Sequence, residues 1–117
     1  MLTNADVPAL TNGAKLPVLS AMTCLVGRFS APGYDSIGEV LVNHAGGGAI
    51  AVWAPTGLSL NEQATKLNRA FFEYIYANED VILGDAVQAS MRAYDSNVAT
   101  FLMKIFTILG DPALRLK

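Results

Sequence analysis

Residues 49–54 constrain the fold of this 117-residue chain more than any other segment. The segment reads Ala-Ile-Ala-Val-Trp-Ala, follows three consecutive glycines at 46–48 and precedes Pro55. A short apolar run bounded by turn residues predicts a strand that is covered on both faces. Because helices are the elements that cover the two faces of such a strand, the segment indicates an α/β fold.

The segments around this strand predict further strands and helices in alternation. Residues 16–23 form another short apolar run and predict a strand. Ser36-Ile-Gly-Glu39 and Ser59-Leu-Asn-Glu62 each fit a capping box, in which a serine oxygen and a glutamate carboxylate satisfy free amides at the start of a helix. We therefore expect one helix from Ser36 to about residue 45 and a second helix from Ser59.

The second helix has an apolar face, and further elements follow it. Helices are predicted over residues 82–94 and 97–109, and residues 114–116 could add a brief edge strand. The apolar face of the second helix repeats at a spacing of 3.6 residues and consists of Leu60, Ala64, Leu67, Phe71 and Ile75.

This order of elements predicts a mainly parallel sheet with flanking helices, in a single domain over residues 1–117. Only two clear strands are present, and parallel sheets are rarely that small. The architecture is therefore expected to be part of a larger layered fold.

The composition bears on the partners of the chain. Only 15% of the residues are charged whereas 52% are hydrophobic, which suggests that part of the surface is covered by another copy or by another part of the same protein. The 8 Lys and Arg residues are scattered and outnumbered by 10 Asp and Glu residues, so nucleic acid is not expected as a partner. No segment has the length and hydropathy of a membrane span.

No cofactor and no metal site are expected. A single cysteine and a single histidine cannot make a metal site of the usual coordination. The glycines at 46–48 leave a helix and enter a strand, which is the reverse of the order that a phosphate-binding loop needs.

Cys24 is the residue most suggestive of chemistry. It ends the apolar run 16–23, and Gly27 breaks the chain three residues later. The carboxyl edge of a parallel sheet is where ligands bind in open α/β folds. A lone cysteine near a strand end is more often a small buried apolar residue, so the position alone leaves both interpretations open.

The sequence resembles the gingipain-like cysteine peptidases, which share the caspase-like fold. The likeness lies in the segment Met22–Phe29, which is similar to the nucleophile segment of that family. It continues in Ser36–Glu39 followed by Gly47–Trp53, and in Leu109–Leu116, which is similar to the motif that closes the peptidase domain. The resemblance implies a partial caspase-like three-layer sandwich.

The resemblance also implies roles for particular residues. Cys24 would be the nucleophile that attacks a peptide carbonyl, and its own amide would donate one oxyanion hydrogen bond. Gly27 would let the loop turn away from the substrate. The wall of the pocket for the side chain that precedes the scissile bond would consist of Trp53, Ala54, Pro55, Thr56 and Gly57.

The chain departs from the family pattern at the catalytic histidine. In the family this residue lies in a His-Gly segment before the cysteine, and no histidine precedes Cys24 here. We therefore expect the Cys-bearing, C-terminal portion of a peptidase domain, not competent alone. The partner would be a His-bearing segment of a longer protein or a second copy of this chain. The alternative is a non-catalytic, self-associating or binding module descended from such a peptidase.

His44, the only histidine, is expected to play a structural part. It falls in the last turn of the helix after Cys24, where a histidine complements the helix dipole and caps carbonyl groups. No signal peptide is visible, so the compartment is unknown, although the resemblance suggests a bacterial and often exported group of proteins.

Overall fold

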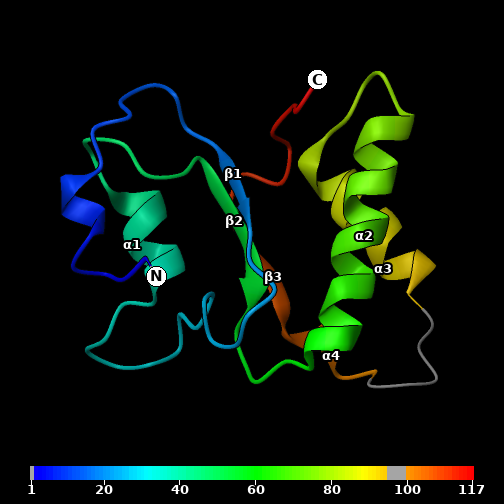
Figure 1. Ribbon diagram of the computed structural model, residues 1–117, viewed down its shortest axis with the longest axis horizontal. Helices are drawn as coiled ribbons and strands as arrows, with labels where there is room; N and C mark the ends of the chain where they lie inside the picture. Colours follow the sequence, from blue (N-terminus) through cyan, green and yellow to red (C-terminus); the bar gives the residue numbers. More distant parts are fainter. Residues whose placement is uncertain (1, 95–99) are drawn as a thin grey trace.

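The computed structural model describes residues 2–94 and 100–117, and its elements form three layers (Figure 1). Helix α1 lies on one side of a small sheet and helices α2 and α3 lie on the other side. In chain order the elements are η1 (Val7–Ala9), β1 (Val18–Ser20), α1 (Ile37–Asn43), β2 (Ala51–Pro55), α2 (Asn61–Ala77), α3 (Leu83–Ala93), α4 (Leu102–Ile105) and β3 (Phe106–Gly110).

The sheet has the strand order β1-β2-β3, with β2 in the centre. Strands β1 and β2 are parallel and joined through α1, with Val18 opposite Ala51. Strands β2 and β3 are antiparallel, with Trp53 opposite Ile108. The predicted α/β sheet with flanking helices is confirmed, but the sheet is mixed and not mainly parallel, because one of its two strand pairs is antiparallel.

The strand β3 replaces most of the helix that the sequence predicted over residues 97–109. Only residues 102–105 of that segment are α-helical, and residues 97–99 lie outside the described residues. A short run that is apolar on both faces suits a covered strand as well as a buried helix. Pairing with β2 decides between them, because it satisfies the free edge of the central strand.

Strand β2 is completely buried and separates two apolar clusters. Its side chains alternate between the faces of the sheet, as the pleat requires. Ala51 and Trp53 belong to the larger cluster with residues of α2 and α3. Val52 and Ala54 belong to the smaller cluster with residues of η1 and α1. The prediction of a strand covered on both faces is confirmed.

Helix α2 buries three of the five residues of the predicted face, and Ile75 is partly buried against the same cluster. Ala64, Leu67 and Phe71 are buried, whereas Leu60 is half exposed. Phe71 packs against the ring of Trp53 with a centroid distance of 4.8 Å. Burial of such aromatic side chains typically contributes about 1.5–3 kcal/mol each, so this contact anchors α2 to the sheet.

The two predicted capping boxes have different outcomes. At the start of α1, Ser36 accepts from the backbone N–H of Glu39, and the Glu39 carboxylate accepts from the backbone N–H of Ser36. At the start of α2 the N-cap residue is Leu60, with no side-chain cap. The prediction of a capping box at Ser59–Glu62 was therefore wrong.

The C-terminal segment pairs outside the sheet. Arg115 forms an isolated antiparallel bridge with Ile82 just before α3. The predicted edge strand at 114–116 is therefore reduced to this single bridge. None of the described helices has both the length and the apolar character needed to span a lipid bilayer.

Candidate functional site

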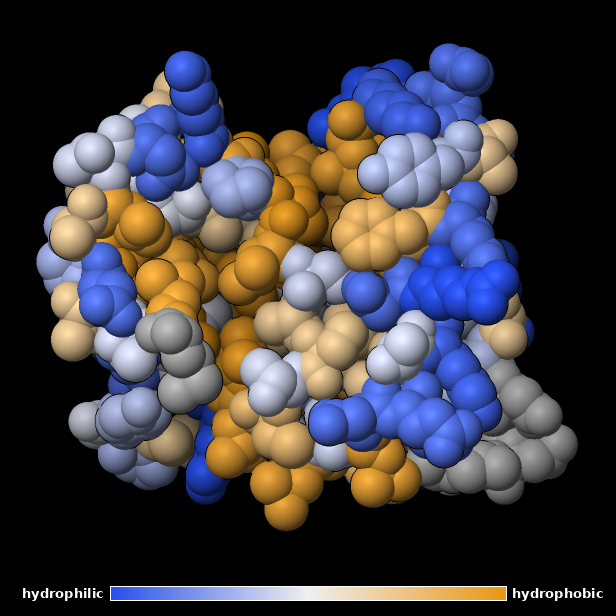
Figure 2. Space-filling view, in the orientation of Figure 1, coloured by the Kyte–Doolittle hydropathy of each residue, from blue (hydrophilic) through white to orange (hydrophobic). Residues whose placement is uncertain are grey.

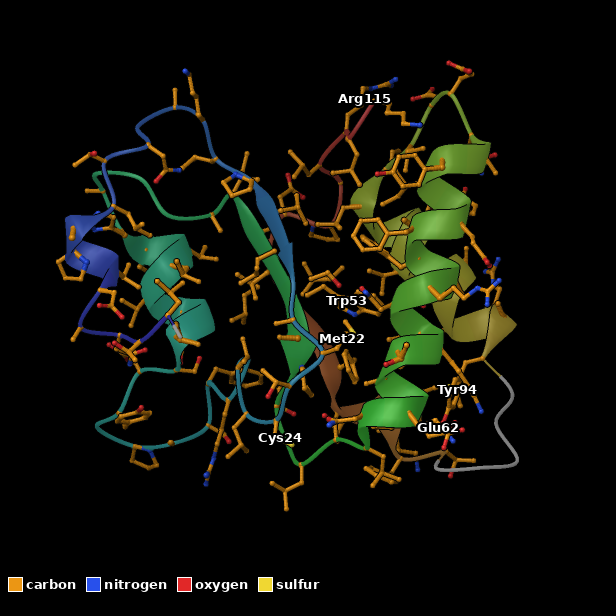
Figure 3. All side chains as sticks on the ribbon, viewed as in Figure 1. Met22, Cys24, Trp53, Glu62, Tyr94 and Arg115 are labelled. Carbon is orange, nitrogen blue, oxygen red and sulfur yellow. The ribbon has the colours of Figure 1, made fainter. Side chains whose placement is uncertain are left out.

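Cys24 lies just beyond the carboxyl end of β1, in a turn that packs against the segment following β2 (Figure 3). Two backbone hydrogen bonds fix this turn: the amide of Leu25 donates to the carbonyl of Gly57 at 3.1 Å, and the amide of Gly27 donates to the carbonyl of Pro55 at 3.0 Å. The structure therefore places the sulfur at the sheet edge that the sequence predicted.

The turn holds Leu25 in an unusual backbone conformation. Its φ of 66° lies in the left-handed region, which is uncommon for a bulky side chain and costs on the order of 1 kcal/mol or more. The amide of Cys24 forms no hydrogen bond to a backbone carbonyl among the described residues, and it points toward the sulfur of its own residue. The turn thus presents a half-exposed thiol beside a backbone N–H that can receive a ligand.

Ser59 contacts the sulfur with both its backbone and its side chain. The backbone N–H of Ser59 donates to Sγ of Cys24 at 3.3 Å. The thiol can donate in turn to the carbonyl oxygen of Ser59 at 3.5 Å, and the Ser59 hydroxyl oxygen lies 3.7 Å from the sulfur. Thus the loop before α2 holds the sulfur through several polar groups of one residue.

These contacts change the acidity of the thiol. The backbone N–H of Ser59, followed by its side chain, lowers the pKa of Cys24 below the usual value of 9.0, while partial desolvation acts in the opposite direction. A hydrogen bond to the charged form favours that form. Because the thiolate is the nucleophile, a lowered pKa increases the reactive fraction near neutral pH.

Gly27 has a packing role in the structure. It is buried, and a Cβ at this position would lie 3.1 Å from the carbonyl oxygen of Ala54. The absence of a side chain therefore lets the turn lie directly on β2. The predicted effect of Gly27 on substrate access stays a prediction.

The predicted pocket wall is divided between the core and the surface. Trp53 and Ala54 are fully buried, and Pro55 is buried with them. Trp53 lies between β2 and α2 (Figure 3), and its indole Nε1–H has no hydrogen-bond partner among the described residues. Trp53 is enclosed by residues of α2 and β3, and Ala54 lies in the cluster on the opposite face of the sheet, so these side chains offer no open wall.

The last two residues of the predicted wall are half-buried. Thr56 donates from both its backbone N–H and its hydroxyl to the carbonyl oxygen of Ile105, at 2.8 and 3.0 Å. The carbonyl of Gly57 accepts from Leu25 in the turn that contains Cys24. Both residues thus position the sheet edge, and their contact with a substrate stays a prediction.

His44 is remote from Cys24. It is the C-cap residue of α1 and precedes β2, so it lies near the amino ends of the parallel strands, whereas Cys24 follows a carboxyl end. Its Nε2 lies 3.0 Å from the carbonyl oxygen of Leu10. The predicted structural part for His44 agrees with this contact, and no imidazole of this chain reaches the sulfur.

The sequence patterns did not predict two features of the site. Ser59 was interpreted as a helix cap, and nothing in the sequence pairs it with a cysteine 35 residues away. The second feature is a cleft of about 510 Å³ beside Cys24, lined by residues 2–5, the 24–28 turn and residues from the 31–37 segment. Both depend on contacts between distant segments, which local patterns do not reveal.

Comparison with known proteins adds a family and a fold. The sequence pattern of peptidase family C25 matches residues 1–117. Among solved structures, the chain is similar to the Arg-specific cysteine proteinase gingipain R, with a TM-score of 0.78 and 21% sequence identity. The similarity covers 97% of this chain and 28% of that chain. None of the curated proteins matches the sequence. The three-layer arrangement is thus the caspase-like fold, of which this chain represents a part.

Proposed function

We propose that this chain, which belongs to peptidase family C25, supplies the nucleophilic cysteine of a peptidase whose catalytic imidazole comes from a different polypeptide segment. The observation that carries the proposal is the placement of the Cys24 sulfur. The sulfur is half-exposed, lies beside a cleft and accepts the backbone N–H of Ser59 at 3.3 Å. These features suit a nucleophile better than a core residue.

The proposed chemistry is acyl transfer. The Cys24 thiolate attacks the carbonyl carbon of a peptide bond, and the amide of Cys24 is available to stabilise the oxyanion. The C–N bond then breaks, the imidazolium protonates the leaving amine, and water hydrolyses the resulting thioester. His44 cannot supply the imidazole because its ring is held at the opposite end of the strands.

The free edge of β1 suits a partner that brings the imidazole. Strand β1 pairs only with β2 in the described part of the chain, and its outer edge is unpaired. Figure 2 shows an apolar band along this edge, between α1 and α2. An unpaired edge with apolar neighbours is a template for strand addition. A His-bearing segment added there would lie next to the strand that leads into Cys24.

The test of this function has two parts. The first measures alkylation of Cys24 by iodoacetamide, which we expect to reach half its maximal rate at a pH below that of an unstructured cysteine peptide. The second measures peptide cleavage after addition of the separately produced His-Gly-containing part of a C25 peptidase domain. We expect cleavage that Cys24→Ala abolishes and that His44→Ala leaves unchanged. Slow alkylation combined with no cleavage would refute the proposal.

The same free edge supports a second candidate function, a self-associating module without catalysis. Two copies could pair their β1 edges and so extend the sheet. Size-exclusion chromatography with light scattering distinguishes the candidates. A stable dimer with a slowly alkylated thiol supports the module, whereas a monomer that gains activity with the His-bearing segment supports the peptidase.

A further inference from the structure

The cleft beside Cys24 is apolar over most of its wall. Leu2 and Ala5 come from the N-terminal segment, Leu25 and Val26 come from the nucleophile turn, and Ile37 comes from the first turn of α1. Because Cys24 is itself one of the lining residues, whatever occupies this cleft lies next to the sulfur.

Most polar side chains of the cleft are already engaged within the chain. The Thr3 hydroxyl donates to the Asp6 carboxylate at 2.6 Å. The Ser36 hydroxyl donates to the Glu39 carboxylate at 2.9 Å. The side-chain amide of Asn4 donates to a backbone carbonyl at 2.8 Å. These hydrogen bonds shape the wall, and the hydroxyl donors of Thr3 and Ser36 are used within the chain.

Arg28 is the charged residue of the cleft. No aspartate or glutamate is among the lining residues, and the nearby carboxylates of Asp6 and Glu39 accept hydrogen bonds from Thr3 and Ser36. Arg28 takes part in none of the ion pairs between described residues. Its side chain is exposed, four residues after Cys24. The ion pairs all lie outside the cleft and are Lys66–Glu62, Arg69–Glu73 and Arg115–Asp80.

We propose that this cleft binds the part of a peptide substrate next to the scissile bond, and that Arg28 selects an acidic side chain in that part. This inference rests on the proposed role of Cys24 as a nucleophile. An unneutralised guanidinium attracts a carboxylate and can bind it through two parallel hydrogen bonds. The apolar wall accommodates the methylene groups of the acidic side chain and the small side chains beside it. Arg28 is thus a specificity-determining residue.

The test uses peptides that carry their own electrophile, so that it does not depend on a catalytic histidine. Chloroacetyl-Ala-Ala-Xaa-Ala-amide peptides, with Glu, Gln or Lys as Xaa, alkylate Cys24 as the thiolate displaces chloride. The rate constant for each peptide is divided by the rate constant for iodoacetamide with the same protein variant. We expect the Glu peptide to react about two to five times faster than the Gln peptide, as for an exposed ion pair. The Lys peptide should be the slowest.

Two variants with the same change of charge assign the effect. Arg28→Glu should reverse the order of the Glu and Lys peptides. Lys15→Glu changes the net charge equally, but Lys15 is exposed in the loop before β1, at the other end of the strand from Cys24. This control should keep the original order. The preference for the Glu peptide should also shrink as ionic strength rises.

The outcomes separate this inference from the function on which it rests. Equal normalised rates for the Glu, Gln and Lys peptides, with rapid iodoacetamide alkylation, would overturn the role of Arg28 and leave Cys24 as the nucleophile. Slow iodoacetamide alkylation would count against the nucleophile, while the ratio of the peptide rates would still report on Arg28. A preference that persists in Arg28→Glu would also overturn the inference.

Discussion

The N-termini of α1 and α2 begin with the same Ser-x-x-Glu pattern but use it in different ways. Ser36 and Glu39 satisfy each other's backbone amides, and Ser36 is 2% exposed. Ser59 lies one residue before the N-cap of α2 and directs its polar groups to the sulfur of Cys24, while Glu62 pairs with exposed Lys66 at 3.2 Å. One serine thus stabilises a helix and the other positions a candidate nucleophile.

The reason for the difference lies in what packs against each helix start. The first turn of α1 is fixed by the turn that contains Cys24, because the amide of Gly38 donates to the carbonyl of Val26 at 2.9 Å. The loop before α2 instead passes beside Cys24, so Ser59 contacts the sulfur of Cys24. The capping pattern predicts a helix start, whereas the neighbours decide which hydrogen bonds are made.

The largest difference in stability between the two helix starts is expected for a substitution of Gly38, the second residue of α1. A Cβ on Gly38 would lie 2.7 Å from the carbonyl oxygen of Val26 and 2.9 Å from Cδ1 of Leu109. Gly38→Ala should therefore lower the free energy of unfolding by about 1–3 kcal/mol through overpacking. Urea unfolding followed by circular dichroism measures this. The control, Asn61→Ala at an exposed position of α2, should change it by less than about 0.5 kcal/mol, and equal effects would contradict the prediction.

The next effect compares the two serines directly. Ser36→Ala removes a formed cap and should lower the free energy of unfolding by about 1 kcal/mol. Ser59→Ala removes no cap, because α2 has no side-chain cap, and should change it by less than about 0.5 kcal/mol. The same unfolding experiment tests both variants. A larger loss for Ser59→Ala than for Ser36→Ala would show that Ser59 acts as a helix cap after all.

The third prediction concerns the pKa of the Cys24 thiol and tests whether the Ser59 backbone N–H lowers it. Ser59→Pro removes the N–H that donates to Sγ of Cys24, so the pKa of the thiol should rise toward its ordinary value. Ser59→Ala keeps the N–H and loses only the hydroxyl, so its upward shift should be smaller. The pH profile of iodoacetamide alkylation measures both shifts, and circular dichroism checks that each variant is folded. An unchanged profile in a folded Ser59→Pro variant would refute the role of the N–H.

The same shift makes stability depend on pH. Because the folded-state pKa of Cys24 is lowered below 9.0, the thiolate stabilises the fold fully above about pH 9, and this contribution is lost as the pH falls through the lowered pKa. Cys24→Ala should therefore lose stability relative to the original chain at alkaline pH and less at acidic pH. Unfolding curves at several pH values, with Ser36→Ala as the comparison, check this.

The last prediction compares Glu39 with Glu62, and the smallest loss of stability is expected for Glu62→Ala. Glu39 accepts from the Ser36 backbone N–H and hydroxyl at 2.8 and 2.9 Å, so Glu39→Ala should lower the free energy of unfolding by about 0.5–1.5 kcal/mol. Among the described residues Glu62 forms an exposed pair with Lys66, so Glu62→Ala should cost a few tenths of a kcal/mol. Raising the salt concentration should reduce only the Glu62 effect. Equal losses in both variants would contradict this assignment.

The candidate site was predicted from the sequence only in its outline. The strand end before Cys24 and the turn at Gly27 follow from local patterns, and the structure places both at the carboxyl edge of the sheet. The family resemblance supplied the expected role of Cys24, and the family and fold are now shown. The contact with Ser59 and the largely apolar cleft beside Arg28 form only when distant segments are brought together.

The sequence by itself determined the elements whose patterns admit one solution. The apolar run of β2, the central part of the 3.6-residue face of α2 and the helix start at Ser36 appear as predicted, because each pattern depends on residues that lie close together in the chain. Only the tertiary structure decided the rest. Residues 106–110 form a strand because they supply hydrogen bonds to the edge of β2. Trp53 is enclosed by residues of α2 and β3, and the Ser59 backbone N–H donates to the sulfur of Cys24. Each of these outcomes depends on a neighbour far away in the chain, and such neighbours leave no periodic signal.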